Sequence, residues 1–161
     1  FVDHIKSLNL DNLTIASPDM GGAKRAKNYA GYLSAEVVIA YKERKKANVV
    51  EEMFLIGDVK DRNVILIDDM IDTAGTLCKA AEILMKNGAK SVRAMATHPV
   101  LSGKAYENIE KSPIVEVIVT DTIPVKADQS SKIKVLSCAS LFADVMKMVH
   151  ENKSISNKFI I

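Results

Sequence analysis

The sequence is poor in cysteine, in net charge and in long apolar runs, and each shortage excludes a class of protein. With only Cys78 and Cys138, no disulfide framework is available, so a reducing, cytoplasmic setting is expected. The net charge of +2 is too small to favour nucleic acid or an anionic membrane surface as a partner. No apolar run approaches the ~20 residues that span a bilayer. The N-terminal FVDHIKSLNL lacks the basic-then-apolar pattern of a signal peptide.

Several sequence motifs of ligand sites are missing as well. The seven glycines never spell G-x-G-x-x-G, and the single Gly-Lys pair, Gly103-Lys104, is followed by Ala105 instead of Ser or Thr. The three histidines lie far from both cysteines and form no H-E-x-x-H, and G-x-S-x-G is absent. These absences exclude a dinucleotide-binding Rossmann site, a P-loop and a nucleophile elbow, and they disfavour a zinc site.

What the sequence does contain is an alternation of short apolar runs with helical patterns. Its 161 residues, 48% hydrophobic and 26% charged, are typical of one globular domain with a sizeable core. We predict strands over residues 13–17, 36–41, 52–57, 64–69, 91–97, 115–119 and 132–136. Strands that alternate with helices favour an α/β fold with a doubly wound, mostly parallel sheet flanked by helices.

The helices between these strands are predicted from apolar positions three and four residues apart. One helix runs from the Gly21-Gly22 pair to Leu33, and a second follows residues 64–76 and stops at Asn87 and Gly88. A short helix covers 103–110. A closing helix is predicted near the C-terminus, with an apolar face made of Leu141, Phe142, Val145, Met148 and Val149.

The stretch VILIDDMIDTAGTL, residues 64–77, carries the most chemistry. Four branched aliphatic residues run directly into Asp68 and Asp69, and a buried carboxylate is costly unless something binds it. In a parallel sheet, ligands bind beyond the carboxyl ends of the strands. The segments SPDMGG, YKERKK, IDDMIDTAGT and ATHP all fall at that end of the predicted sheet, so we expect them to converge on one site.

The TAGT segment, Thr73–Thr76, has two interpretations. It precedes a helix, so free backbone N–H groups, two hydroxyls and Gly75 are suited to a phosphate. A capped helix start with nothing bound fits the segment equally well when it is taken alone. Asp68 and Asp69 would repel a phosphate, which favours sugar hydroxyls or a metal as their ligands. A phosphate-binding loop beside a pair of hydroxyl acceptors describes a sugar-phosphate site.

Two further features lie at the same end of the predicted sheet. The run KERKKAN, residues 42–48, is either a solvated basic loop or a source of fixed cations for a polyphosphate. Asp19, in the turn before the glycine pair, is either a structural turn residue or a contact for a magnesium ion carried by phosphate. Position alone does not separate these interpretations.

Residues 64–77 resemble the phosphoribosyl-diphosphate loop of the type I phosphoribosyltransferase fold. The flanking segments SPDMGGAKRA, YKERKKANVVEEMFLIGDVKDRNVILIDD, ATHPVLSG and VTDTIP resemble the ribose-phosphate pyrophosphokinase family more narrowly. The resemblance covers essentially all 161 residues. It implies transfer of the diphosphoryl group of ATP to the anomeric hydroxyl of ribose 5-phosphate, with phosphoribosyl diphosphate and AMP as products and Mg²⁺ as cofactor.

The resemblance also implies a role for each matching residue. Asp68 and Asp69 would hold the ribose hydroxyls, and Asp19 would be a magnesium ligand. Lys42 matches the family's catalytic lysine and Arg44 a neighbouring catalytic and substrate-binding arginine. The 5-phosphate would be bound by Asp72, Thr73, Ala74, Gly75 and Thr76.

Two departures from the family pattern limit what the resemblance implies. Ala74 stands where many members have Gly or Cys. Members also carry an additional amino-terminal half, which supplies most of the ATP site, a histidine metal ligand and much of the subunit contact. We therefore expect residues 1–161, which begin at Phe1 instead of Met, to be the carboxyl-terminal half of a two-domain enzyme that forms a homo-oligomer, a hexamer in the family. Alone it should lack full activity.

Three rival functions stay open on the sequence. They are a non-catalytic regulatory partner of the synthetase, a phosphoribosyltransferase that consumes phosphoribosyl diphosphate, and a sugar-phosphate-binding regulator. The motifs look intact, EMFLIGDV supplies no obvious base-binding hood, and Lys42 with Arg44 argues mildly against a regulator. The tail with Ser154 and Phe159 resembles a regulatory nucleotide region of some relatives, although a frayed helix end is the favoured interpretation.

Overall fold

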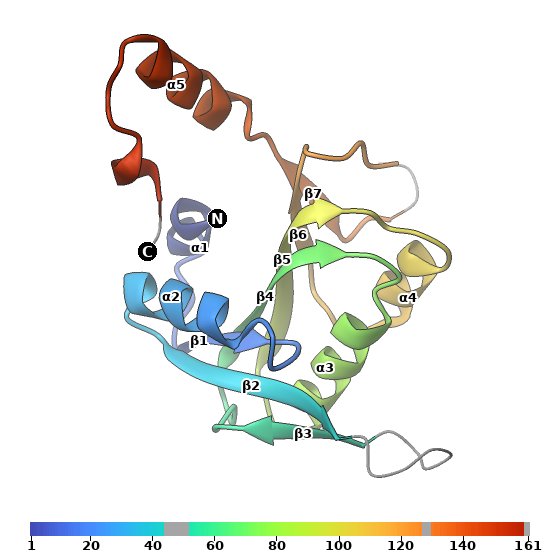
Figure 1. Cartoon of the computed structure of the whole chain (residues 1–161). Coiled ribbons are helices and arrows are strands. Elements are labelled where there is room, and N and C mark those ends of the chain that lie inside the picture. The colour runs from blue at the N-terminus through green and yellow to red at the C-terminus, as the bar shows by residue number, and fades with distance from the viewer. Residues whose placement is uncertain (44–51, 127–129, 160–161) are drawn as a thin grey trace.

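A computed structural model of the chain describes residues 1–43, 52–126 and 130–159, without the side chains of residues 42, 43 and 52. Seven strands form one sheet in the order β3-β2-β1-β4-β5-β6-β7 (Figure 1). All neighbouring strands are parallel except β2 and β3, which pair antiparallel. The strands are β1 Leu13–Ser17, β2 Glu36–Glu43, β3 Glu52–Ile56, β4 Asn63–Ile71, β5 Ser91–Pro99, β6 Val117–Thr120 and β7 Ile133–Leu136.

The centre of the sheet is buried on both faces because helices cover both. After Asn63, β4 continues with four buried aliphatic residues, Val64 to Ile67, the continuous apolar run that is typical of a doubly covered strand. Ile65 and Ile67 pack on one face with α1 (Val2–Ser7) and α2 (Ala23–Leu33). Val64 and Leu66 pack on the other face with α3 (Gly75–Lys86) and α4 (Ala105–Lys111). The predicted doubly wound α/β architecture is confirmed.

Most predicted elements form close to their expected limits. Strand β2 continues two residues past the predicted end, through Lys42 and Glu43, so the KERKKAN run begins inside a strand. Helix α3 ends as predicted, with Asn87 as its C-cap and Gly88 at a φ of +91°, a conformation that glycine adopts without strain. The N-terminal helix α1 was not predicted. Within the described residues, no helix is long and apolar enough to cross a membrane.

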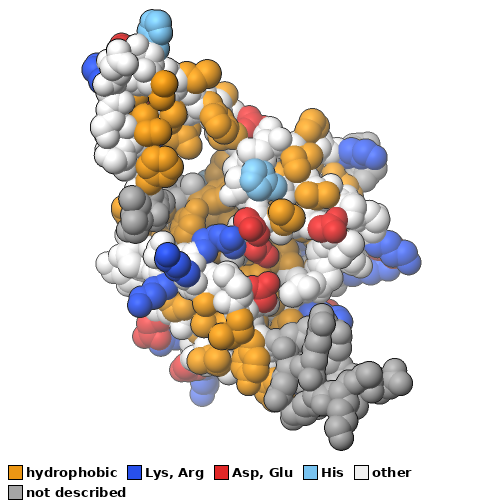
Figure 2. All heavy atoms as spheres, in the orientation of Figure 1, with side chains coloured by type: hydrophobic (Ala, Val, Ile, Leu, Met, Phe, Trp, Pro, Cys, Tyr) orange, Lys and Arg blue, Asp and Glu red, His pale blue; other side chains and the backbone are white. Residues whose placement is uncertain are grey.

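The closing helix, α5 (Ala139–His150), forms where it was predicted but does not close the fold. It stands away from the sheet (Figure 1), and none of its residues is buried. Leu141, Phe142 and Val149 are exposed, and apolar side chains line the helix on the side of the molecule's body (Figure 2). Beyond it, the tail forms one short 3-10 helix, η2 (Ser156–Lys158).

Candidate functional site

The sheet has one point where the strand order reverses. From β1 the chain moves outward to β2 and β3, and it then returns to the other side of β1 to build β4 and the remaining strands. Ligands of open α/β sheets bind at the carboxyl ends of the strands beside such a reversal. The turn after β1 and the carboxylates at the end of β4 lie there, and Figure 2 shows acidic side chains gathered near the middle of this face.

The turn between β1 and α2 is held by hydrogen bonds of its own residues. Asp19 Oδ1 accepts the backbone N–H of Gly22 at 2.9 Å, and Ser17 Oγ donates to the Asp19 carbonyl at 2.6 Å. A Cβ at Gly22 would lie 2.4 Å from Ser17 Oγ, so glycine is required by space. Asp19 is exposed, and no hydrogen bond to its second carboxylate oxygen occurs within the described residues.

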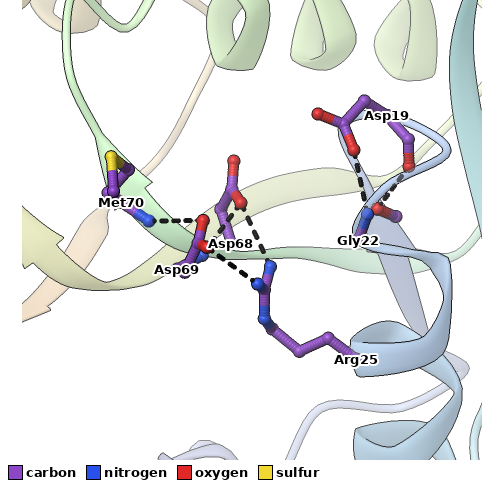
Figure 3. A network of polar contacts seen from close by, with 7 residues as sticks. Asp19, Gly22, Arg25, Asp68, Asp69 and Met70 are labelled. Atoms are coloured by element: carbon purple, nitrogen blue, oxygen red, sulfur yellow. Dashed lines mark hydrogen bonds and ion pairs between the residues drawn. The ribbon is translucent and has the colours of Figure 1, made fainter.

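Asp68 and Asp69, the predicted hydroxyl acceptors, share one arginine from α2 (Figure 3). Arg25 Nη1 lies 3.2 Å from Asp68 Oδ1, and Nη2 lies 3.1 Å from Asp69 Oδ2. Two backbone groups add to this arrangement: the Asp69 N–H donates to Asp68 Oδ1 at 2.8 Å, and the Met70 N–H donates to Asp69 Oδ1 at 2.9 Å. The side chains are 23% and 55% exposed, so neither carboxylate points into the core.

The two carboxylates differ in their proton affinity. Burial, with the nearby Asp69 and Asp19 carboxylates, raises the pKa of Asp68 to about 6. The hydrogen bond with Asp68 and the charge of Arg25 lower the pKa of Asp69. Like charges held close together separate their pKa values in this way. Near neutral pH both groups are ionised and can accept hydrogen bonds.

The loop from Asp72 to Thr76 presents backbone donors at the start of α3. Ala74, the N-cap, has a φ of +60° and is 5% exposed, and no side chain caps the helix. Within the described part of the chain, none of the backbone N–H groups from Thr73 to Leu77 donates a hydrogen bond to another residue. Alanine is rarely left-handed, and such strain gathers at functional sites. The interpretation of this loop as a side-chain-capped helix start is therefore wrong.

The segment after β5 braces this loop from outside. Ser102 Oγ donates to Asp72 Oδ1, and the Ser102 N–H donates to the Asp72 carbonyl at 3.1 Å. Asn108, from α4, donates through Nδ2 to the Thr73 carbonyl at 2.9 Å. The hydroxyl-bearing residues Thr73 and Thr76 are exposed. The loop is thus fixed in place while its donors stay open.

The remaining predicted residues are placed only in part. Lys42 lies near the carboxyl end of β2, paired with Met53 of β3, so its backbone is at the same end of the sheet as Asp68. Arg44 lies outside the described residues, as does the rest of the basic run. No group of three or more His, Cys, Asp or Glu residues that could hold a metal ion occurs within the described ranges. The metal role of Asp19 therefore stays a prediction.

Arg25 is the site residue that the sequence did not single out. Its helical spacing placed it, with Lys24 and Lys27, among the charges outside the apolar face of α2. Only the adjacency of β1 and β4 brings it to the carboxylates. Beside the site, at the ends of β5 and β6, His98 Nδ1 lies 3.0 Å from Thr122 Oγ1, whose hydroxyl donates to the Thr97 carbonyl at 2.9 Å.

Comparison with known proteins relates both sequence and fold to one enzyme family. Residues 47–160 match the family described as the phosphoribosyl synthetase-associated domain. The chain is 55% identical over 160 residues to the ribose-phosphate pyrophosphokinase of Wolinella succinogenes and covers 99% of its own length and 52% of that protein. The corresponding enzyme of Campylobacter jejuni is 53% identical, with 99% and 52% covered. The chain thus spans about half the length of these curated relatives.

The solved structures agree with the sequence relatives. The crystal structure of phosphoribosylpyrophosphate synthetase from Mycobacterium smegmatis matches with a TM-score of 0.84 at 34% identity, over 94% of this chain and 49% of that one. Adenine phosphoribosyl transferase from Trypanosoma brucei matches with a TM-score of 0.59 at 22% identity, over 89% and 73%. This second likeness concerns the fold alone.

Proposed function

The chain belongs to the ribose-phosphate pyrophosphokinase family, and we propose that it carries the ribose 5-phosphate site of such an enzyme. The intact protein would transfer the diphosphoryl group of ATP to the anomeric hydroxyl of ribose 5-phosphate. Its products would be phosphoribosyl diphosphate and AMP. The chain itself would be the carboxyl-terminal half, and the half absent from these residues would supply most of the ATP site.

The observation that carries this proposal is the pairing of two opposite binding chemistries at one reversal point of the sheet. Asp68 and Asp69 offer carboxylate oxygens, which accept hydrogen bonds from sugar hydroxyls. The uncapped start of α3 offers backbone N–H donors and the positive end of a helix dipole, which suit a phosphate. A ribose bearing a 5-phosphate satisfies both sets at once.

The transferred group would be stabilised by cations near this site. Lys42 and Arg44 would contact the diphosphoryl oxygens as charge redistributes between the leaving AMP and the anomeric oxygen. In such transfers, positioning and electrostatic stabilisation do most of the catalysis. The backbone position of Lys42 at the carboxyl end of β2 is compatible with this role.

Asp19 would contribute one carboxylate oxygen to a magnesium ion that arrives with the phosphates. Its exposed position, with one oxygen bonded to Gly22 and the other without a described partner, fits this role. Magnesium is commonly held by one or two carboxylates together with phosphate oxygens and water, so a dedicated cluster of protein ligands is not required. Bound there, the ion would neutralise phosphate charge.

The phosphate role of the loop is tested by Gly75→Val. A Cβ at Gly75 would meet only Thr73 Oγ1, at 3.7 Å, and the position has no positive φ, so the variant should fold. Its side chain would crowd the N–H donors and weaken ribose 5-phosphate binding about tenfold or more in calorimetry. Gly31→Val, on α2, is the matched control because a Cβ there meets nothing within 4 Å. Equal affinities in both variants would remove the phosphate role.

The activity itself is tested with the full-length protein. Incubation with ATP, Mg²⁺ and ribose 5-phosphate should release AMP in step with phosphoribosyl diphosphate. A phosphoribosyltransferase would instead consume phosphoribosyl diphosphate in the presence of a base. A regulatory partner or a sugar-phosphate-binding regulator would bind ligand without releasing AMP. The intact protein is proposed to form a homo-oligomer, a hexamer, and light scattering would measure the mass of this assembly.

A further inference from the structure

Among the residues that the structure describes, Arg25 is the one side chain that contacts both Asp68 and Asp69. It reaches from the first turns of α2 and contacts one oxygen of each carboxylate, at 3.2 and 3.1 Å (Figure 3). A guanidinium is a rigid planar fork with several N–H donors, so it fixes the spacing of two oxygens that it contacts together.

Two consecutive carboxylates on a strand do not converge by default. Successive side chains of a strand point to opposite faces of the sheet, and two like charges repel. In β4, Asp68 pairs with Ala96 of β5 and Met70 pairs with His98, whereas Asp69 has no partner in this register. Asp69 lies between them, and its side chain turns to share Arg25. Among the described side chains, Arg25 is the cation that both carboxylates contact.

Stability alone does not account for this arrangement. The Arg25 side chain is 33% exposed and that of Asp69 is 55% exposed, and ion pairs this open contribute little to folding. The guanidinium nevertheless lies close to the turn after β1, because a Cβ at Gly22 would be in ordinary contact with Arg25 Nη1, at 3.5 Å. The arrangement holds two like charges close together, and it contributes little folding energy in return.

We propose that Arg25 is a positioning residue that holds Asp68 and Asp69 as one hydroxyl-accepting unit and thereby sets the preference for ribose over a sugar that lacks a hydroxyl. This inference rests on the proposed function. Arg25 occupies Asp68 Oδ1 and Asp69 Oδ2, and Asp68 Oδ2 has no hydrogen-bond partner within the described residues. That oxygen is left for the sugar, and Arg25 does not itself contact the substrate.

The test compares ribose 5-phosphate with 2-deoxyribose 5-phosphate by calorimetry on the 161-residue chain. The wild-type chain should prefer ribose 5-phosphate by about tenfold or more, because a charged acceptor loses a hydroxyl partner in the deoxy sugar. In Arg25→Gln that preference should fall to about twofold or less. Arg25→Lys keeps the charge without the fork, so an intermediate preference is expected.

Lys24→Gln is the matched control, because it removes the same charge from an exposed neighbouring position of α2. Its preference for ribose should equal that of the wild type. If Arg25→Gln lowered the affinity for both sugar phosphates equally and kept the preference for ribose, Arg25 would act only by attracting the phosphate charge. That result would contradict the proposal. An unchanged preference in Arg25→Lys would also overturn it, and this variant serves if Arg25→Gln does not fold. Failure of the wild-type chain to bind either sugar phosphate would count against the proposed function instead.

Discussion

Asp68→Asn should make the ligand-free chain more stable while it weakens ribose 5-phosphate binding. The folded chain keeps Asp68 in a partly buried position beside two other carboxylates, and its pKa rises from 3.8 to about 6. Because the pKa of Asp68 is higher in the folded chain than in the unfolded chain, the contribution of Asp68 to stability is greatest below the unfolded pKa. This contribution is lost as the pH rises through about 6. Asparagine has nearly the same shape but carries no charge, so it escapes this loss.

The magnitude follows from the shift. Two pKa units correspond to ~3 kcal/mol at neutral pH. The folded pKa already includes the attraction of Arg25, which lies 3.2 Å away, so no separate ion-pair cost is subtracted. Solvent screening of the partly exposed carboxylate reduces the loss to ~2 kcal/mol. A net gain of ~2 kcal/mol is expected near pH 7, or ~5 °C in melting temperature for a chain of this length. Near pH 4.5 the gain should fall below ~1 kcal/mol, because Asp68 is then protonated in the folded chain, and it should vanish only below the unfolded pKa of 3.8.

Urea unfolding of the wild-type chain and the Asp68→Asn variant at both pH values measures this difference. The contributions of the other titrating groups cancel in the difference in unfolding free energy, because both proteins contain them. Asp61→Asn is the matched control: it is an exposed aspartate in a loop, and its variant should show no such pH-dependent gain. A variant less stable than the wild type at neutral pH, or a gain that did not depend on pH, would refute the account of Asp68.

Two further predictions concern catalysis and its division between the halves of the protein. In the full-length enzyme, Lys42→Ala should lower kcat far more than it raises the KM for ribose 5-phosphate, because a cation that acts on the transition state affects turnover most. If steady-state kinetics showed a change in KM alone, Lys42 would serve only to bind the substrate. The melting temperature of the 161-residue chain should rise with ribose 5-phosphate and change little with ATP alone. The chain should form almost no AMP, because the alignment of ATP with the sugar can be worth ~7 kcal/mol or more. Rapid AMP formation in a coupled assay would show that the other half is not needed.

The sequence predicted those parts of the fold whose signals are local. The uninterrupted apolar run at residues 64–67 correctly predicted a buried strand, and the acidic residues that follow it lie at the partly exposed end of β4. Asn87 and Gly88 marked the end of α3 correctly. The six-residue helix α1 was missed because a helix this short shows too few apolar positions for its period to stand out.

The missing parts of the site depend on contacts between distant segments. Arg25 was predicted to be a solvent-facing charge, because no local feature of the sequence indicates that β1 lies beside β4. The braces from Ser102 and Asn108 come from a segment about thirty residues beyond the loop. The positive φ of Ala74 has no local signal either, because alanine does not favour that conformation.

Helix α5 shows a different limit. Its apolar periodicity correctly predicted a helix, but a periodic pattern says only that a face can be buried, and not what buries it. Within the described residues that face meets no layer of the fold, and Phe142 is 56% exposed. The helix was therefore predicted correctly, and its packing was predicted wrongly.

The central claim, that Asp68, Asp69 and the Asp72–Thr76 loop together bind ribose 5-phosphate, is tested most directly by a crystal structure of the chain with that ligand. The account predicts phosphate oxygens within hydrogen-bond distance of backbone N–H groups at the start of α3. It also predicts ribose hydroxyls on the carboxylates of Asp68 and Asp69, with Arg25 still joined to both. A sugar phosphate bound elsewhere, or bound here with its hydroxyls turned away from both carboxylates, would contradict the claim.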